Sequence, residues 1–265
     1  MPTLPGALPF PCSRETASGP IRGRRGKVVG MAVAEDDFRR WRSTVAPNVG
    51  LTTLSKAAGY SRMLIRQQLS GDRVQEATVI KICRALDLDP LEQLRSFPAR
   101  GSLEPSRPDK REIGAFIRWE HLLRACAISD LDGEAPTESS LGPLFGPETS
   151  RQWVDDIDPD HGLRKHLQAH GPISSPGLSK NLNGPLRYDL AVLAVQDAAL
   201  PPISALVVSR LLTPAEAGWE PDERVHWMQG LATLERLQLL EDRTHAAIVR
   251  QQHGGRAAAP QQPFS

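Results

Sequence analysis

Residues 51–71 show the clearest alternation of apolar and polar positions, and the pattern predicts two short helices joined by a tight turn. The first helix is expected to end at Gly59, since glycine adopts a positive φ at little cost. Ser61 stands where a helix N-cap is expected, and the second helix then runs to residue 69. Apolar residues at helical spacing predict that one side of this second helix is buried. These residues are Leu64, Ile65 and Leu69.

The opposite side of the second helix is polar and is expected to point outward. It presents Arg62, Met63, Arg66 and Gln67. Arginine can pair with guanine through two hydrogen bonds, and glutamine can pair with adenine in the same way. A buried apolar stripe opposite such a face is typical of a helix that enters the major groove of DNA. The two helices are therefore predicted to form a helix-turn-helix.

Helical periodicity resumes after residue 110 and predicts a second, all-helical part of the chain. Helices are expected at 111–129, 148–155, 161–170, 186–200 and 203–212. The stretch 203–212 is also rich in β-branched residues, but no alternating partner strand is present, which favours a helix. A longer amphipathic helix is expected over residues 221–250. Its apolar residues recur every three positions, at Val225, Met228, Leu231, Leu234, Leu237 and Leu240.

Three stretches without apolar periodicity divide the chain into two predicted domains, 34–97 and 111–252. Residues 1–33 are expected to be a disordered tail, because proline, glycine and arginine dominate them. Met31 stands just before a plausible helix start and is an alternative first residue of the protein. If translation begins at residue 1 instead, the basic tail could lie along the phosphate backbone of DNA. Residues 98–110 contain three prolines and a glycine, which predicts a linker. Residues 253–265 are expected to be a second disordered tail.

The run AGYSRMLIRQQLSG, followed by ICRALDLDP, resembles the Cro/C1-type (Xre) family of helix-turn-helix regulators. The likeness covers about residues 36–97: FRRWRSTVAP is similar to the family's first helix, and EATVIKICRALDLDPLEQL to its fourth and fifth. Ser55 and Gln68 depart from the family pattern, which usually has alanine and an apolar residue at these positions. The resemblance implies an all-α protein with a five-helix, lambda-repressor-like domain, here followed by the second all-helical domain.

The resemblance also implies a transcription regulator, foremost a repressor, whose partner is a double-stranded DNA operator. Its recognition helix would occupy the major groove and exclude polymerase from the promoter. The base-reading residues would be Arg62, Met63, Arg66 and Gln67. The phosphate contacts would come from Arg42, Lys56, Ser61 and Arg73. A prophage immunity repressor and a host regulator both fit these residues.

The distribution of charge agrees with DNA contact by the N-terminal part. Residues 38–73 contain seven basic residues and a single acid. A surface of one sign is the expected footprint for phosphate contact. Residues 98–265 carry seventeen basic and twenty-two acidic residues, and the formal net charge of the whole chain is only +1. This balance excludes a protein that coats nucleic acid along its length and favours specific binding by a small patch.

Motifs for catalysis or metal binding are weak, so no enzyme activity, metal or cofactor is expected. The run 154–170 opens like a calcium loop, but His161 and Leu167 stand where glycine and glutamate are required. His166 and His170 are four residues apart and could share a metal, yet the glutamate of an HExxH motif is missing. The sequence has no phosphate-binding loop, no nucleophile elbow, and no serine–lysine pair suited to self-cleavage.

Cysteine usage and hydropathy indicate a cytoplasmic protein, associated with the nucleoid when it is bound to DNA. Cys12, Cys83 and Cys126 are odd in number and widely spaced, so neither a disulfide framework nor a metal pattern follows. The most apolar segment, 190–200, is too short to span a bilayer, and no signal peptide is evident. No membrane partner is expected.

The role of residues 111–252 is left open by their sequence: dimerisation, a second DNA contact and binding of a signal all fit. The stripe in 221–250 favours an internal core face, but it could also join two chains, whose paired recognition helices would read a palindromic site. Three tryptophans are expected in the core rather than in a ligand cage; they are Trp153, Trp219 and Trp227. The alternative function is an antitoxin-like or other protein-interaction module whose acidic C-terminal domain binds a protein partner.

Overall fold

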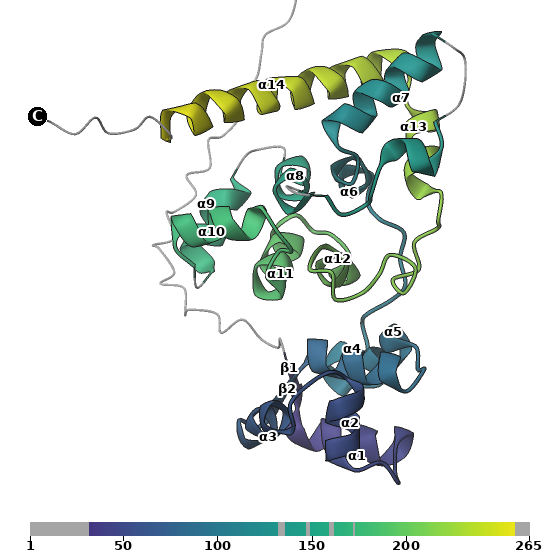
Figure 1. Ribbon diagram of the computed structural model, residues 1–265, viewed down its shortest axis with the longest axis vertical. Coiled ribbons are helices and arrows are strands. Elements are labelled where there is room, and N and C mark those ends of the chain that lie inside the picture. The colour runs from purple at the N-terminus through teal and green to yellow at the C-terminus, as the bar shows by residue number, and fades with distance from the viewer. Residues whose placement is uncertain (1–31, 132–135, 147–148, 159–161, 172, 258–265) are drawn as a thin grey trace, which may run out of the picture.

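The computed structural model describes residues 32–131, 136–146, 149–158, 162–171 and 173–257, to which the structural statements below refer. The protein is predominantly α-helical, with one small two-stranded sheet, which confirms the predicted all-α class. The chain runs from one end of the molecule to the other, with the first five helices gathered at one end (Figure 1). No helix among the described residues is long and apolar enough to cross a membrane.

The N-terminal part packs five helices against a short sheet. The helices are α1 (Glu35–Val45), α2 (Leu51–Ala57), α3 (Arg62–Ser70), α4 (Glu76–Ala85) and α5 (Pro90–Arg95). The strands are β1 (Ala32–Ala34) and β2 (Arg73–Gln75), which pair antiparallel with Val33 opposite Val74. Both valines are buried, so the expectation of a disordered tail up to residue 33 is wrong for its last two residues. Burial of Val33 and pairing with β2 account for the difference.

Local sequence signals set the bounds of α2 and α3. Gly59 adopts a φ of +70° in the turn between them. The Ser61 side chain caps α3 and accepts a hydrogen bond from the Leu64 N–H at 3.2 Å. Ile65 is fully buried in the core, as the apolar spacing predicts. Leu64 differs from the prediction, because it lies at the edge of the stripe and remains exposed.

The two residues that depart from the family pattern both have structural roles. Ser55 is buried, and its hydroxyl donates to the Thr52 carbonyl at 2.9 Å, so its polar atom is satisfied inside α2. Gln68 joins α3 to the following elements. Its side-chain oxygen accepts from the Gln75 N–H and from the Thr78 hydroxyl, both at 3.0 Å. An apolar residue at position 68 would make neither bond.

Residues 98–110 pack along the protein, whereas their composition predicts a spacer between two folded parts. They begin with the short 3-10 helix η1 (Pro98–Arg100), and Leu103 is buried. The Ser106 N–H donates to the Ala217 carbonyl at 3.3 Å, and Arg107 forms an ion pair with Glu220. The buried side chains of Leu103 and Pro108 and these polar contacts hold the segment in place.

The second part is a layered arrangement of helices. They are α6 (Lys110–Ala115), α7 (Trp119–Leu131), α8 (Thr149–Asp156), α9 (Leu163–His170), α10 (Ser175–Leu182), α11 (Tyr188–Asp197), α12 (Pro202–Val208), α13 (Glu223–Gly230) and α14 (Thr233–Ala257). A 3-10 helix, η2 (Glu138–Leu141), follows α7. Helices α9 to α12 lie between the N-terminal part and the outer helices, and α14 lies at the far end (Figure 1).

The structure departs from the predicted helices of this part at three places. The helix expected at 111–129 is divided between α6 and α7. Helix α10 lies between residues 170 and 186, where no helix is predicted; Ser174 caps it, and Leu178 and Leu182 are buried. The helix expected at 221–250 is interrupted after Gly230, where Leu231 is extended. Trp153 and Trp219 are buried as predicted, whereas Trp227 is only half-buried.

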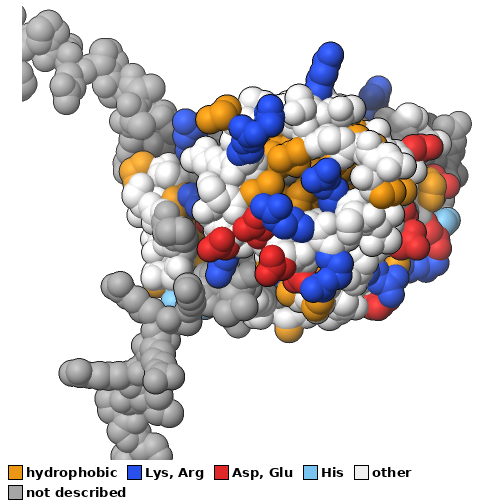
Figure 2. Space-filling model, turned by 90° about the horizontal axis from the view of Figure 1, so that it is seen from below, with side chains coloured by type: hydrophobic (Ala, Val, Ile, Leu, Met, Phe, Trp, Pro, Cys, Tyr) orange, Lys and Arg blue, Asp and Glu red, His pale blue; other side chains and the backbone are white. Residues whose placement is uncertain are grey.

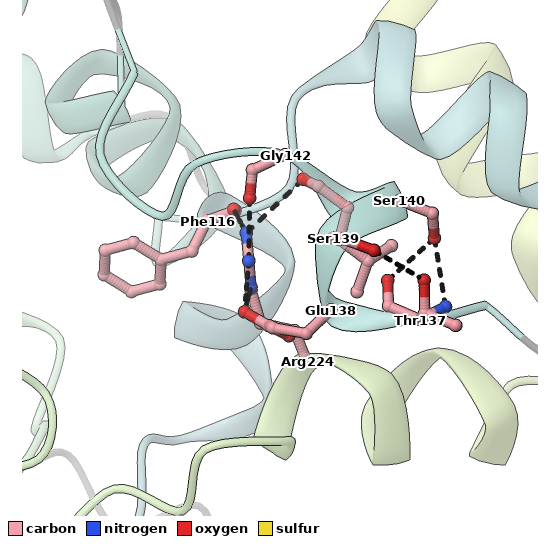
Figure 3. A network of polar contacts seen from close by, with 8 residues as sticks. Phe116, Thr137, Glu138, Ser139, Ser140, Gly142 and Arg224 are labelled. Carbon is pink, nitrogen blue, oxygen red and sulfur yellow. Dashed lines mark hydrogen bonds and ion pairs between the residues drawn. The ribbon is translucent and has the colours of Figure 1, made fainter.

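A buried arginine fastens the start of α13 to the segment around η2. Arg224 is buried, and its guanidinium forms an ion pair with Glu138. It also donates to the carbonyls of Phe116 at 2.9 Å, Gly142 at 2.8 Å and Leu141 at 3.4 Å. Figure 3 shows these contacts converging on the guanidinium from two separate segments. The fork of N–H donors suits this task, since arginine can serve several acceptors at once.

Candidate nucleic-acid interface

The four predicted base-reading residues lie together on the outward face of α3. Arg62, Met63, Arg66 and Gln67 are all exposed. Met63 is 72% exposed. Within the described part of the chain, no ion pair is recorded for Arg62 or Arg66. This face of the helix is therefore available for contact with another molecule.

The predicted phosphate-contacting residues differ in their exposure and in whether they already have partners within the protein. Lys56 and Arg73 are exposed, and neither pairs with an acid among the described residues. Ser61 is exposed at the start of α3, where its hydroxyl already accepts from Leu64. Arg42 is half-buried and donates to the Val49 carbonyl at 3.0 Å, so one of its nitrogens is engaged within the protein. The sequence does not reveal this contact.

The positive charge on this part is smaller than the sequence count indicates. Arg39 pairs with Glu35 and Arg40 pairs with Asp37, both within α1. The acids are at the start of α1, where they also favour its N-terminus. Figure 2 views this end of the molecule, and Lys and Arg side chains are spread across it with some acidic side chains beside them. The unpaired positive charge is concentrated on α2, α3 and β2.

A hollow between α1 and α3 brings together residues that the sequence analysis did not connect. It has a volume of about 380 Å³, and Arg39, Arg42 and Arg66 line it together with Glu35 and Asp72. Arg39 is not among the phosphate-contacting residues predicted from the sequence. Its spacing of three residues from Arg42 on one helix face was the available signal. Because Arg39 is already paired with Glu35, the guanidinium groups of Arg42 and Arg66 are the ones at this hollow that suit an anionic group such as a phosphate.

The N-terminal part, α1 to α5, is held against the second part of the protein. Arg84 of α4 donates to both carboxylate oxygens of Glu216, at 2.8 and 2.6 Å, and to the Leu211 carbonyl at 2.8 Å. The pKa of Glu216 is lowered: burial would raise it, but the hydrogen bonds from Arg84 and Thr213 outweigh that effect. The orientation of α3 is thus tied to the rest of the chain.

A second polar contact at this junction is buried. Arg100 of η1 forms an ion pair with Glu76 at the start of α4, and Glu76 is almost fully buried. Burial raises the pKa of Glu76, while the charge of Arg100 and a hydrogen bond with Tyr188 of α11 lower it in part. One continuous apolar core runs from Val33 to Trp219 across the junction. The two parts therefore do not move as independent domains.

The histidines and acids of 154–170 do not assemble a metal site in the described residues. The rings of His166 and His170 are 4.4 Å apart, and His166 Nδ1 lies 3.3 Å from an Asp197 carboxylate oxygen. No group of three or more His, Cys, Asp or Glu side chains that could hold a metal is found in the described part of the chain. His161 lies outside the described residues.

Comparison of the chain with models of protein families, with curated proteins and with solved structures finds no match.

Replacement of the α3 cap tests the local geometry of this face. Ser61→Ala removes the acceptor for the Leu64 N–H and is expected to lower the free energy of unfolding by about 1 kcal/mol, measured by urea denaturation. Ser61→Asp retains a capping oxygen and is expected to keep the stability of the unaltered protein. An alanine variant as stable as the unaltered protein would show that the cap contributes nothing.

Proposed function

We propose that this protein is a sequence-specific DNA-binding transcription regulator that represses by placing α3 in the major groove at a promoter. The observation that carries the proposal is the outward face of α3, where four exposed side chains lie opposite the buried Ile65. Arg62 and Gln67 supply the donors and acceptors that distinguish base pairs, and Met63 supplies an apolar contact for a thymine methyl group. The resemblance of residues 36–97 to the Cro/C1-type family points in the same direction.

The phosphate contacts come from residues around this face. Lys56 on α2 and Arg73 on β2 carry unpaired positive charge on either side of α3. Arg42 and Arg66, which line the hollow between α1 and α3, bind a further phosphate. Such contacts fix the position of the protein on the duplex, whereas the residues of α3 select the sequence.

Selection of bound duplexes from a random pool tests the proposal. The full chain, immobilised at moderate salt, is expected to enrich a short motif that spans one or two turns of the duplex. The Arg62→Ala variant serves as the matched control, and it is expected to relax the motif at one position. Failure of the full chain to enrich any motif would overturn the proposal.

Loss of a phosphate contact is expected to act on all sequences alike. Lys56→Ala should weaken specific and non-specific binding by the same factor and lower the slope of log K against log salt by about one. Lys165→Ala is the matched control, because Lys165 is an exposed lysine of α9, outside the proposed interface. Titrations at several salt concentrations measure both quantities. An unchanged slope for Lys56→Ala would remove Lys56 from the interface.

A homodimer is the second element of the proposal. Helix α14 exposes Leu234, Leu237 and Ile248, which share one face of the helix at heptad-like spacing. A second copy seated on this face would pair two α3 helices and read a palindromic site. Light scattering of the full chain and of Leu237→Arg tests this: the variant is expected to be monomeric. A monomeric unaltered protein would contradict the dimer, and a different protein co-purifying at unit stoichiometry would favour an antitoxin-like interaction module.

A further inference from the structure

A cavity beneath α14 is unrelated to the proposed DNA interface. It has a volume of about 530 Å³ and lies among residues of α6, α7, α8, α13 and α14. Pockets of a few hundred cubic ångströms are the size that binds small organic molecules. Helix α14 lies at the end of the molecule opposite α1–α5 (Figure 1). The cavity is therefore far from the face assigned to DNA.

Two tryptophans give the cavity aromatic walls. Trp119, at the start of α7, and Trp227, in α13, both line it and are both half-buried. Trp227 packs so closely on Gly114 that a Cβ at that glycine would lie 3.0 Å from the indole ring. Gly114 thus allows the ring to approach α6 closely. Indole faces attract organic cations, and tryptophan is the strongest of the aromatic residues in this respect.

Three carboxylates face the same space. They belong to Asp155 and Asp156 at the end of α8 and to Asp242 of α14. Asp155 pairs with Arg164, and Asp156 pairs with the buried Arg243. No partner for Asp242 is recorded among the described residues, and its side chain is exposed. Of the three carboxylates that line the cavity, that of Asp242 therefore has no partner among the described residues.

The carboxylates affect one another across the cavity. The pKa of Asp156 is raised to about 6: burial is the main cause, Arg243 acts in the opposite direction, and the charges of Asp155 and Asp242 contribute to the rise. Asp155 and Asp156 are each paired with an arginine, so Asp242 is the carboxylate of this wall whose charge a bound cation would meet.

Besides Arg243, two basic residues line the cavity, and neither holds its charged group inside it. Lys110 is exposed at the first residue of α6, and its flexible side chain can extend into water. Arg111 donates to Asp109 and to the Ala198 carbonyl, which commits its guanidinium elsewhere. His245 lines the rim and is exposed. The lining thus combines two indole rings, two carboxylates that are paired with arginines, and the unpaired carboxylate of Asp242.

We propose that this cavity binds a small organic cation, an amine whose ammonium group lies between the tryptophan faces and the carboxylates of Asp156 and Asp242. The apolar part of such an amine would rest on Trp119, Trp227 and Leu239. The site goes beyond the proposed function and does not depend on it, because binding is measured without DNA.

A series of probes that differ only in charge tests the site. Benzylammonium, benzyl alcohol and benzoate are titrated separately into the full chain, and the five tryptophan indole N–H signals are followed by NMR. Benzylammonium is expected to shift the signals of Trp119 and Trp227 but not those of Trp41, Trp153 and Trp219. Such a small probe is expected to bind in the millimolar range. Equal or tighter binding of benzoate, or no shift with any probe, would overturn the proposal.

Variants identify the carboxylates. Asp242→Asn is expected to weaken benzylammonium binding by about tenfold, the usual effect of losing one charge-assisted contact. Its side chain is exposed, so folding should be unaffected. Glu92→Gln, an exposed change on α5, is the control and should bind like the unaltered protein. Asp156→Asn provides an independent second test, with folding checked by circular dichroism. Benzylammonium binding that is unchanged in both aspartate variants would overturn the role of the carboxylates.

Discussion

Arg224→Ala is expected to lower the free energy of unfolding by about 3–5 kcal/mol, which is a large share of the stability of an ordinary domain. The substitution removes a guanidinium that serves a carboxylate and three backbone carbonyls at once. The carbonyls lie in segments that are far apart in sequence from α13, so they lose their shared donor (Figure 3). A buried acceptor without a donor retains its full desolvation penalty. Urea denaturation followed by circular dichroism measures the loss.

Two companion variants separate the ion pair from the carbonyl contacts. Glu138→Gln keeps all of the carbonyl bonds, and the side chain of Glu138 is 37% exposed, so a loss of only about 1 kcal/mol is expected. Arg224→Lys keeps the charge but has no planar fork, and it should fall between the two. If Glu138→Gln were as damaging as Arg224→Ala, the ion pair, rather than the carbonyl contacts, would account for the stabilisation.

Local signals explain why α2 and α3 could be predicted from the sequence. A glycine at positive φ, a serine cap and an apolar stripe all act within about a dozen residues. The strands β1 and β2 have only three residues each, too few for an alternating pattern. Their pairing joins Val33 to Val74, and the burial of both depends on the assembled core. Tertiary contacts of this kind leave no periodic trace in the chain.

The interrupted helix near residue 231 has a geometric explanation. Apolar residues that recur every three positions do not follow the helical repeat of 3.6, so each step turns by about 60° around the axis. Leucines spaced in this way cannot all face one core in a single straight helix. Val225 and Met228 are buried by α13, whereas Leu234 and Leu237 are exposed on α14. The apolar residues of α13 therefore face the core before the break, whereas Leu234 and Leu237 lie on an exposed surface after it.

The sequence predicts which side chains of the candidate site are exposed. It does not predict which of its residues are held by contacts with distant segments of the chain. The α3 side chains follow from helix periodicity alone, which is why Arg62 and Gln67 are exposed as expected. Contacts between distant segments decide the rest. Arg42 is engaged by Val49, and α4 is fixed to the second part through Arg84 and Glu216. The cavity beneath α14 likewise requires five helices to be placed before it exists.

The double variant Arg62→Ala, Gln67→Ala is expected to weaken binding to the selected duplex by about 2–6 kcal/mol, the range for the loss of two specific base contacts. Binding to a scrambled duplex of the same length should be unchanged or slightly weaker, because Arg62 contributes only its charge there. Fluorescence anisotropy at a fixed salt concentration measures both affinities. Both side chains are exposed, so the stability of the protein should stay within about 0.5 kcal/mol of the unaltered chain.

The ratio of the two affinities, rather than either alone, distinguishes base reading from charge. If Arg62 and Gln67 read bases, specific binding falls to nearly the level of non-specific binding in the double variant, and the ratio approaches one. If they only attract the duplex, both affinities fall together and the ratio is preserved, as for Lys56→Ala. A preserved ratio would therefore contradict the placement of α3 in the major groove.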